Sequence, residues 1–366
     1  MNPILQFGTS RFLQAHVDLF VSEALERGQA LGQITVVQTT GSASSAARIA
    51  AFNSGPYPVR IRGLQDGRRI EREQLVGSVG RAVHADSDWG WIVEQVASTV
   101  RVIVSNTGDT GYQLHPDDHL RPPRSFPAKL HALLHARYLN GAAPITLLPC
   151  ELVRQNGSVL RDIVIDLATR AGNDSGFLDY LRNGCTWVNS LVDRIVSEPI
   201  EPAGAVAEPY ALWAIEAQPG MLLPCAHPDI IVTDSLDTFE RRKLFLLNLG
   251  HTWLAEQWLA QGLPADLSVA EAMNDSALRA SLEHVWESEV LPVFDALGDG
   301  AGARSYCAQV RERFLNPFLH HRLADIAQNH AEKKRRRMLP LLGLAGSSGR
   351  TIEQPQLRAL LDESPA

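Results

Sequence analysis

Short apolar runs alternate with amphipathic stretches through the first half of the chain. Four runs have the length and composition of buried strands: residues 3–7, 34–38, 101–105 and 145–148. Four stretches place apolar residues at helical spacing: residues 11–26, 46–52, 89–97 and 128–138. Residues 59–62 alternate like a further strand. This order predicts an α/β fold in which helices cover both faces of a parallel sheet.

The second half of the chain has a different pattern. Residues 198–209 are rich in proline and alanine, which indicates a connection. Two short strands are expected at 212–216 and 230–233. Mostly helix follows: residues 235–261, 268–274, 276–288, 304–314 and 320–331. We therefore predict one domain over residues 1–198 and a mostly α-helical catalytic or substrate domain over 199–366.

Composition narrows the class of protein. With 366 residues, 45% hydrophobic and 20% charged, the chain suits about two globular domains. A net charge of −7 argues against nucleic acid as a partner, and the lack of a long apolar run argues against a membrane. The four cysteines are scattered, which favours a reducing compartment and no metal site. The start of the chain lacks the pattern of a secretory signal, so we expect a cytoplasmic protein.

One predicted helix sets polar residues among apolar ones. At about 100° per residue, four of them share an arc of roughly 140° on a helix that looks buried nearly all round: Glu240, Lys243, Asn248 and His251. Burying an unpaired polar group costs roughly 1–3 kcal/mol, so function is a plausible reason for them. Desolvation would lower the pKa of a lysine toward the range of acid–base catalysis, and an amide can donate to an oxyanion. The alternative is a structural Glu240–Lys243 ion pair beside a histidine of the core. The spacing alone supports this structural role and the catalytic role about equally.

The turn after the first strand is a candidate dinucleotide site. Gly8-Thr9-Ser10-Arg11-Phe12 stands where a Rossmann-like domain binds a pyrophosphate, although only Gly8 of the usual three glycines is present. An ordinary strand–helix turn is at least as probable from the residues alone. The second strand ends at Gln38 with no acidic residue for a ribose and no arginine directly there for a 2′-phosphate, since Arg48 stands a turn or two into the next helix. These residues specify the cofactor poorly, and NAD is expected with NADP as the alternative. Ser105, Asn106 and Thr107 end a later strand at the same edge of the sheet.

Other polar residues are candidates for binding a substrate. Glu151 and Asn156 follow the strand after Ser105. Asp193 adjoins Arg194 in an apolar strand, where a structural ion pair is favoured about two to one. A substrate anion would need a cation, which Arg313 or the run Lys333–Arg337 could supply. That run is expected to end the last helix, where it would otherwise be a solvated terminus.

Seven motifs, taken in order, resemble the polyol-specific long-chain dehydrogenase/reductase family, which includes mannitol dehydrogenase and tagaturonate reductase. The resemblance covers roughly residues 4–342. The motifs are Phe7-Gly8-x-Ser10-x-Phe12, Ser105-Asn106-Thr107, Pro127-Ala128-Lys129-Leu130, Pro149-Cys150-Glu151-Leu152 with Asn156-Gly157, Val192-Asp193-Arg194-Ile195-Val196, Lys243-x4-Asn248-x2-His251 and Arg313-Phe314-x-Asn316-Pro317.

The resemblance implies an NAD(P)-linked, metal-independent interconversion of a secondary alcohol and a ketone on an open-chain sugar derivative. It makes Lys243 the general acid–base, Asn248 an oxyanion donor and His251 a group that orients the substrate. Glu240 matches a position that relays the proton in some members. Leu152 replaces an asparagine of mannitol dehydrogenases, and the Cys-Glu-Leu form resembles tagaturonate reductase, as does the spacing from Phe314 to His321.

The expected substrate is therefore a sugar acid of the tagaturonate or altronate type. A polyol or polyol-phosphate dehydrogenase is the alternative within the class. A catalytically silent dinucleotide sensor is the alternative outside it, motivated by the degenerate glycine loop. A metal-dependent alcohol dehydrogenase is disfavoured, because cysteine and histidine ligands are not grouped.

Overall fold

The computed structural model describes residues 2–41, 43–108 and 110–362, and the chain divides into two compact units. The first unit comprises Met1–Ile61, Arg72–Ala207 and Ala211–Leu236. The second comprises Arg62–Glu71, Glu208–Tyr210 and Asp237–Ala366. The first unit therefore runs past the boundary predicted at residue 198. It does so because the strands at 205–207 and 212–216 pair with strands of the first unit.

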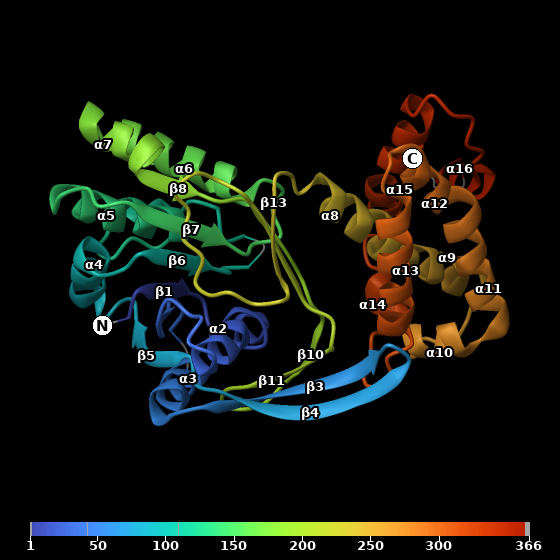
Figure 1. Ribbon diagram of the computed structural model, residues 1–366, viewed down its shortest axis with the longest axis horizontal. Coiled ribbons are helices and arrows are strands. Elements are labelled where there is room, and N and C mark those ends of the chain that lie inside the picture. The colour runs from blue at the N-terminus through green and yellow to red at the C-terminus, as the bar shows by residue number, and fades with distance from the viewer. Residues whose placement is uncertain (1, 42, 109, 363–366) are drawn as a thin grey trace. The chain divides into compact units, whose positions relative to one another are not determined.

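A six-stranded parallel sheet forms the centre of the first unit, in the order β5-β2-β1-β6-β7-β8 (Figure 1). Its strands are β1 (Ile4–Phe7), β2 (Ile34–Gln38), β5 (Val79–His84), β6 (Val102–Ser105), β7 (Ile145–Pro149) and β8 (Cys185–Trp187). The order reverses between β1 and β6, since the chain winds outward from this point in both directions. In such sheets the crevice beyond the ends of those two strands is the usual ligand site. The predicted α/β class is confirmed.

The helices of the first unit cover this sheet. They are α1 (Arg11–Gln14), α2 (Val17–Glu26), α3 (Ala43–Ser54), α4 (Trp89–Ser98), α5 (Phe126–Leu139), α6 (Asn156–Arg170) and α7 (Ser175–Asp179). Figure 1 shows α4, α5 and α6 side by side against one face, over an apolar cluster that includes Phe7 and Ile103. The helix predicted at 11–26 is interrupted at His16, whose φ and ψ of −128° and −88° are not helical. The buried His16 ring bonds the carbonyl oxygen of Leu212 at 3.0 Å.

Two smaller sheets complete the strand structure, in the orders β10-β11-β3-β4 and β13-β12-β9. Their strands are β3 (Tyr57–Gln65), β4 (Arg68–Val76), β9 (Ser190–Asp193), β10 (Val196–Pro199), β11 (Ala205–Ala207), β12 (Leu212–Glu216) and β13 (Ile230–Thr233). The connection predicted at 198–209 is therefore partly strand. Strand β4 was not expected either, because its side chains are mostly charged and exposed.

The second unit is mostly helical, as predicted, around a core that contains Trp253, Trp286 and Phe314. Its helices are α8 (Asp237–Arg242), α9 (Leu249–Gln261), α10 (Val269–Asn274), α11 (Ser276–Val285), α12 (Leu291–Ala296), α13 (Gly300–Phe314), α14 (Leu323–Ile326), α15 (His330–Ser347) and α16 (Pro355–Asp362). None of the helices in the described ranges is both long and apolar enough to cross a membrane.

Four predictions for the second unit need correction. The stretch 235–261 is broken by a π-helical turn at Lys243–Asn248, and the stretch 276–288 ends in a second π turn at Trp286–Val290. The stretch 320–331 is α14 and the start of α15, separated by Asn329 in the left-handed region at φ +54°. The basic run Lys333–Arg337 lies inside α15 and does not end it. Buried Met338, Leu341 and Ala345 continue the inner face of that helix beyond the run.

Candidate active site

Gly8 lies beyond the end of β1, where the main chain comes close to the residue that follows β6. Its φ is +111°, and its amide donates to the carbonyl oxygen of Val37 at 3.1 Å. A β-carbon at this position would lie 2.5 Å from the carbonyl oxygen of Asn106. Both the backbone conformation and the close approach therefore require glycine. The loops after β1 and β6 touch here through main-chain atoms, which suits a ligand held by peptide groups.

The residues after Gly8 divide between the crevice and the core. Ser10 accepts the amide of Leu13 as the N-cap of α1, and its hydroxyl donates to the Asn106 side chain at 3.1 Å. Arg11 forms an ion pair with Glu201 at 2.5 Å. Phe12 stacks on His16 at a centroid distance of 4.7 Å, so its ring contributes to packing. Ser10 and Asn106 thus join the two loops that border the crevice.

Glu151 joins the ends of β6 and β7. Its carboxylate accepts the Ser105 hydroxyl at 3.0 Å, the Thr107 amide at 3.0 Å and the Thr107 hydroxyl at 2.9 Å. The Tyr112 hydroxyl adds a longer contact at 3.3 Å. Burial raises the pKa of the Glu151 carboxyl, while the hydrogen bonds to it act in the opposite direction. Since its oxygens already have protein donors, Glu151 holds the strand ends in place, and we do not retain the substrate-binding role predicted for it.

Asn156 is also used by the fold. Its amide nitrogen donates to the carbonyl oxygens of Pro149, Glu151 and Ser190 at 3.0–3.1 Å. Its amide oxygen accepts the main-chain N–H groups of Gly157 and Ser190, each at 2.9 Å. An asparagine with all these partners has no remaining hydrogen-bonding capacity for a substrate. The substrate role predicted for Asn156 is therefore not retained.

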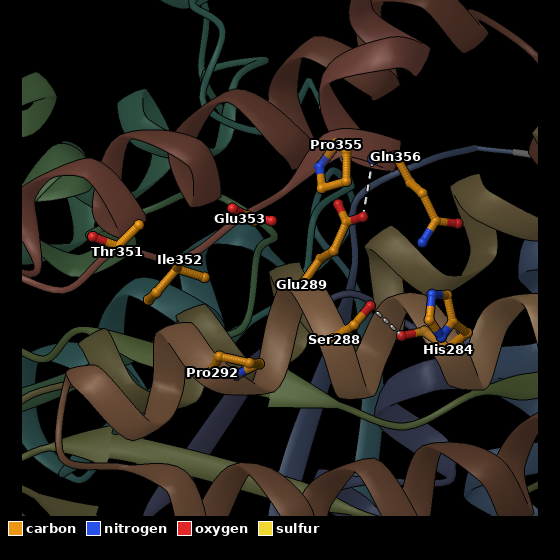
Figure 2. Close-up of a pocket in the computed structure, with 9 residues that line it drawn as sticks. All are labelled: His284, Ser288, Glu289, Pro292, Thr351, Ile352, Glu353, Pro355 and Gln356. Carbon is orange, nitrogen blue, oxygen red and sulfur yellow. Dashed lines mark hydrogen bonds between the residues drawn. The ribbon is translucent and has the colours of Figure 1, made fainter.

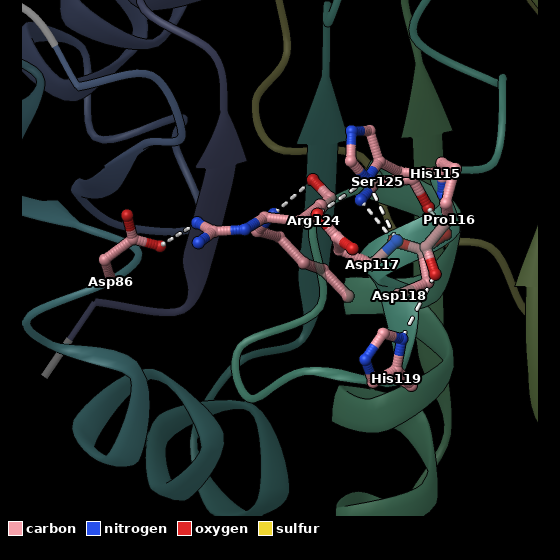
Figure 3. Close-up of polar contacts among 9 residues, drawn as sticks. Asp86, His115, Pro116, Asp117, Asp118, His119, Arg124 and Ser125 are labelled. Atoms are coloured by element: carbon pink, nitrogen blue, oxygen red, sulfur yellow. Dashed lines mark hydrogen bonds and ion pairs between the residues drawn. The ribbon is translucent and has the colours of Figure 1, made fainter.

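A clasp of polar contacts anchors the long loop that follows Thr107 (Figure 3). Asp118 accepts the amide of Ser125 at 2.6 Å and its hydroxyl at 2.7 Å, and also the amide of His115 at 2.8 Å. Arg124 extends in the other direction to Asp86 at 3.6 Å. Buried Lys129 donates to the carbonyl oxygen of Arg124 at 2.5 Å. The motif around Lys129 is therefore structural, because the lysine fixes this loop at the start of α5.

Asp193 and Arg194 lie inside the first unit. Asp193 ends β9, where it is buried and paired in register with Leu212. Arg194 is buried too and donates to the carbonyl oxygen of Ala15 at 2.7 Å. These contacts give both residues a part in the packing of the unit. The substrate role of Asp193 stays a prediction.

In the second unit, Lys243 and Asn248 stand at the two ends of the π turn. Both side chains are partly exposed, whereas Phe245, Leu246 and Leu247 between them are buried. The expectation of a helix buried all round at α-helical angles is therefore wrong at this point, because the wider turn shifts each residue after it. Glu240 lies one turn earlier in α8 and is also partly exposed. Single π turns inside α-helices occur frequently at functional sites.

Arg337 stabilises the end of this π turn. Its guanidinium donates to the carbonyl oxygen of Asn248 at 2.9 Å and to the Thr252 hydroxyl at 2.7 Å. Burial lowers the pKa of Arg337 to about 10, and the nearby Arg336 adds to this effect. A π turn disturbs the regular i→i−4 ladder, so a carbonyl near its end needs another donor. The basic run was predicted to be a solvated terminus. Its last residue, Arg337, instead bonds a main-chain oxygen of the candidate site.

Two histidines meet beside the π turn. The buried His251 ring lies 4.4 Å from Phe314 and 5.0 Å from His321, measured between centroids. Burial lowers the pKa of His321, and the positive charge of Lys333 lowers it further. Nδ1 of His321 is buried with no hydrogen-bond partner among the described residues. His251 and His321 therefore form a polar pair beside the candidate catalytic helix, and the charges of Asp325 and Lys333 act on the pKa of His321 in opposite directions.

Arg313 has a partner of its own. Its guanidinium forms a two-pronged ion pair with Glu208, at 3.0 and 2.8 Å, and stacks over the Tyr210 ring. The side chains of Arg313 and Glu208 are only 3% and 2% exposed. A guanidinium held in this way is not available to clamp a substrate anion, so we withdraw that role for Arg313. Lys333 is the remaining candidate, because its Nζ contacts only the carbonyl oxygen of Ile326, at 2.9 Å, among the described residues.

Glu208→Ala is expected to destabilise the second unit by about 3–5 kcal/mol, because it leaves the Arg313 charge buried without its carboxylate. Urea unfolding followed by tryptophan fluorescence measures the change. Asp325→Ala is the matched control, since it removes an exposed partner of Arg322 and should cost less than about 1 kcal/mol. A loss in Glu208→Ala no larger than that of the control would show that the pair contributes little.

Metal ligands are not grouped in the part of the chain that the structure describes. No three histidine, cysteine, aspartate or glutamate residues there lie in a position to hold an ion. Activity is therefore expected to survive prolonged dialysis against a chelator, measured as turnover before and after. Loss of turnover that zinc restores would contradict this prediction.

A pocket away from these residues lies in the second unit (Figure 2). It lies between the region of His284 and Ser288 and the segment 351–356. Glu289 points toward Gln356 and accepts its amide at 2.9 Å. The carboxylate also accepts the Leu357 amide at 3.0 Å, so it caps the start of α16. None of the predicted site residues lines this pocket.

Arg337 was predicted only as part of a basic run that could bind a substrate anion, and its bonds to Asn248 and Thr252 were not expected. A signal was available, because the buried residues of α15 repeat at helical spacing: Lys334, Met338, Leu341 and Ala345. That pattern marks one face of a long helix and places Arg337 next to it. Arg337 would then have been expected to contact a neighbouring helix.

Family models match nearly the whole described chain. The mannitol dehydrogenase Rossmann domain matches residues 2–222, and the mannitol dehydrogenase C-terminal domain matches residues 235–354. Among curated relatives, an altronate oxidoreductase of Bacillus subtilis is 32% identical over 93% of this chain and 74% of its own. An altronate oxidoreductase of Klebsiella pneumoniae is 31% identical over 97% of this chain and 77% of its own.

Solved structures show the same fold. A D-sorbitol dehydrogenase in substrate-free form superposes with a TM-score of 0.82 at 20% identity, over 95% of this chain and 77% of its own. Pseudomonas fluorescens mannitol 2-dehydrogenase, in a ternary complex with NAD and D-mannitol, has a TM-score of 0.74 at 19% identity. That match covers 99% of this chain and 77% of the other.

Proposed function

Because the chain belongs to the mannitol dehydrogenase family, we propose that it interconverts a secondary alcohol and a ketone on an open-chain sugar acid of the tagaturonate or altronate type, with NAD as cofactor. Family membership makes it a nicotinamide dinucleotide-dependent dehydrogenase acting on CH–OH groups. The observation that carries the substrate class is the match to curated altronate oxidoreductases along almost the whole chain.

The crevice of the first unit suits a dinucleotide. Gly8 lets the main chain after β1 approach the carbonyl of Asn106 too closely for a β-carbon, and the Ser10 hydroxyl bonds the Asn106 side chain there. We propose that Gly8, Ser10 and Asn106 hold the pyrophosphate, with Gln38 toward the ribose. The loop residues Arg11, Phe12, Ser105 and Thr107 would shape this site. When bound, the nicotinamide supplies the hydride acceptor or donor.

The second unit supplies the proton chemistry in this proposal. Lys243 would take the hydroxyl proton during oxidation and return it during reduction. Asn248 would donate its amide N–H to the reacting oxygen, and His251 would orient the substrate. The partly exposed Glu240, one turn from Lys243, would pass the proton on to solvent.

A sugar acid also needs a partner for its carboxylate. Lys333 is proposed for this, with His321 beside it, because the positive charge of Lys333 acts on His321. In this proposal Lys333 takes the role first considered for Arg313, whose charge is already neutralised by Glu208. We also propose a cytoplasmic location, in keeping with four buried free thiols.

A substrate panel tests the assignment. We expect a higher kcat/KM for hexuronates or aldonates than for neutral hexitols or hexitol phosphates, followed through the absorbance of reduced nicotinamide. The preference should shrink as salt is added, because a partly exposed charge pair is screened. If mannitol or another neutral polyol is a better substrate than every acid, the sugar-acid assignment is wrong and a polyol dehydrogenase replaces it. If a hexitol phosphate is best, a polyol-phosphate dehydrogenase does.

The variant Lys333→Met tests whether Lys333 binds the substrate carboxylate. It should lower kcat/KM for the acid about tenfold and leave neutral polyols almost unchanged, since a charge-assisted contact contributes roughly 1.5–3 kcal/mol before screening. Arg335→Met, an exposed change two residues along the same helix, is the control. Equal losses for acids and polyols would remove Lys333 from carboxylate binding.

A further inference from the structure

The end of β2 has no carboxylate. Gln38 is buried there, and its amide oxygen accepts the hydroxyl of Thr9, the residue after Gly8. Its amide nitrogen donates to the carbonyl oxygen of Thr40 at 3.2 Å. In dinucleotide-binding sheets, the residue at this strand end contacts the adenosine ribose at its 2′ position. This chain therefore offers neutral amide and hydroxyl groups where an NAD-specific fold offers an acid.

Arg48 reaches the same place from α3. Its Nη1 donates to the Thr9 hydroxyl at 3.1 Å, so the guanidinium lies beside the Thr9–Gln38 contact that joins the tips of β1 and β2. Nε of Arg48 is buried and has no hydrogen-bond partner among the described residues. No carboxylate in the described ranges forms an ion pair with Arg48 within 4 Å. A guanidinium donor at the strand tips is thus left without a close ion-pair partner among the described residues.

The local charge is positive. Arg11 lies close enough to Arg48 to lower its pKa, after the larger effect of burial. The carboxylate that opposes this is Glu201, which is 68% exposed and already paired with Arg11. Two guanidinium groups therefore face one exposed carboxylate beside the crevice. Two positive groups and one negative group leave a local charge of +1, which favours the binding of an anion.

We propose that Arg48 forms a subsite for the 2′-phosphate of NADP, so that the chain binds NADP(H) as well as NAD(H). This rests on the proposed use of a nicotinamide dinucleotide. A phosphate monoester carries a charge of about −1.5 to −2 near neutral pH, and a guanidinium binds such a group through two parallel N–H donors. An acid at the end of β2 would repel this phosphate, and here that acid is replaced by Gln38.

Binding measurements without substrate test the subsite. Calorimetry is used with NADH, NADPH, 5′-AMP and 2′,5′-ADP, on the wild type and on Arg48→Ala. Wild-type dissociation constants for NADPH and NADH should agree within about tenfold, and 2′,5′-ADP should bind more tightly than 5′-AMP. Arg48→Ala should weaken NADPH and 2′,5′-ADP at least tenfold while NADH changes less than threefold. Arg170→Ala, which removes an exposed arginine of α6, is the control and should change none of these values.

Two further variants test which property of Arg48 and Gln38 determines the preference between NADPH and NADH. Arg48→Lys keeps the charge but loses the two-pronged geometry, so its loss for NADPH should be intermediate. Gln38→Glu restores the acid and should shift the preference toward NADH by at least tenfold. Thermal unfolding of each variant shows that it is folded.

Three outcomes overturn the proposal. If the wild type binds NADH but not NADPH, the subsite does not exist, although the proposed function stands. Equal weakening of NADH and NADPH in Arg48→Ala would mean that Arg48 holds the shared pyrophosphate instead. If neither dinucleotide binds, both this inference and the proposed cofactor fail.

Discussion

Lys243→Ala is expected to lower kcat by about 10²–10⁴-fold, the range that a positioned general acid–base contributes. Dinucleotide affinity should hardly change, because the crevice around Gly8 belongs to the first unit and Lys243 to the second. The position supports the expectation. Lys243 starts a π turn, and such turns recur at functional sites. Single-turnover measurement of nicotinamide reduction, with binding measured separately, resolves the two effects.

Arg241→Ala is the matched control for this variant. It removes a cation two residues earlier in α8, where it pairs with Asp237 at 3.7 Å on the surface. Its turnover should stay within about twofold of the wild type, since exposed pairs contribute little. If Lys243→Ala keeps near-normal turnover, Lys243 has no part in proton transfer. The silent dinucleotide sensor would then gain support.

The parallel sheet was predictable because its central strands are short, apolar and uninterrupted. Strands β1, β2, β6 and β7 are buried along their whole length, so composition alone identified them. Strand β5 was not predicted, because Val79–His84 contains a glycine and an arginine and is only partly buried. Strand β4 is mostly charged, and its place in a sheet depends on pairing with β3. Such strands are defined by distant partners that local pattern does not contain.

The π turn was not predictable from spacing. Both α and π geometry place polar residues among apolar ones in Lys243–Asn248, and the two differ by one residue in the span of each hydrogen bond. Arg337 bonds the main-chain oxygen at the end of this turn from 89 residues away in the chain. These residues do lie in one helical segment, as predicted. The positions around the helix axis that were assigned at 100° per residue are wrong after the π turn.

Ligand-binding residues were harder to predict than strands and helices. A polar side chain at the end of a strand can bind a ligand or stabilise the fold, and the sequence does not distinguish the two. Glu151 and Asn156 proved to have protein partners for their polar atoms. Arg313 is neutralised by Glu208, 105 residues earlier. The sequence pattern singled out one edge of the sheet and one helix as candidates. It did not contain the distances that decide which groups remain available.

Gly8→Ala should weaken dinucleotide binding by about 10- to 100-fold. The added β-carbon would start 2.5 Å from the carbonyl oxygen of Asn106 and would have to displace the loop that borders the crevice. Overpacking of this kind costs about 1–3 kcal/mol, and 1.4 kcal/mol is a tenfold change in affinity. The fold should persist, because the loops after β1 and β6 can shift while the strands remain paired. Calorimetric titration with NADH and NADPH measures the loss.

Gly141→Ala separates this effect from backbone strain. Gly141 has a φ of +103°, close to that of Gly8, but a β-carbon there would meet no atom within 4 Å. Both variants therefore force alanine into the left-handed region, and only Gly8→Ala narrows the crevice. Gly141→Ala should lower stability by a similar amount and leave dinucleotide affinity unchanged. If the two variants bind NADH and NADPH alike, the close approach of Gly8 and Asn106 has no role in binding, and the dinucleotide must occupy another part of the first unit.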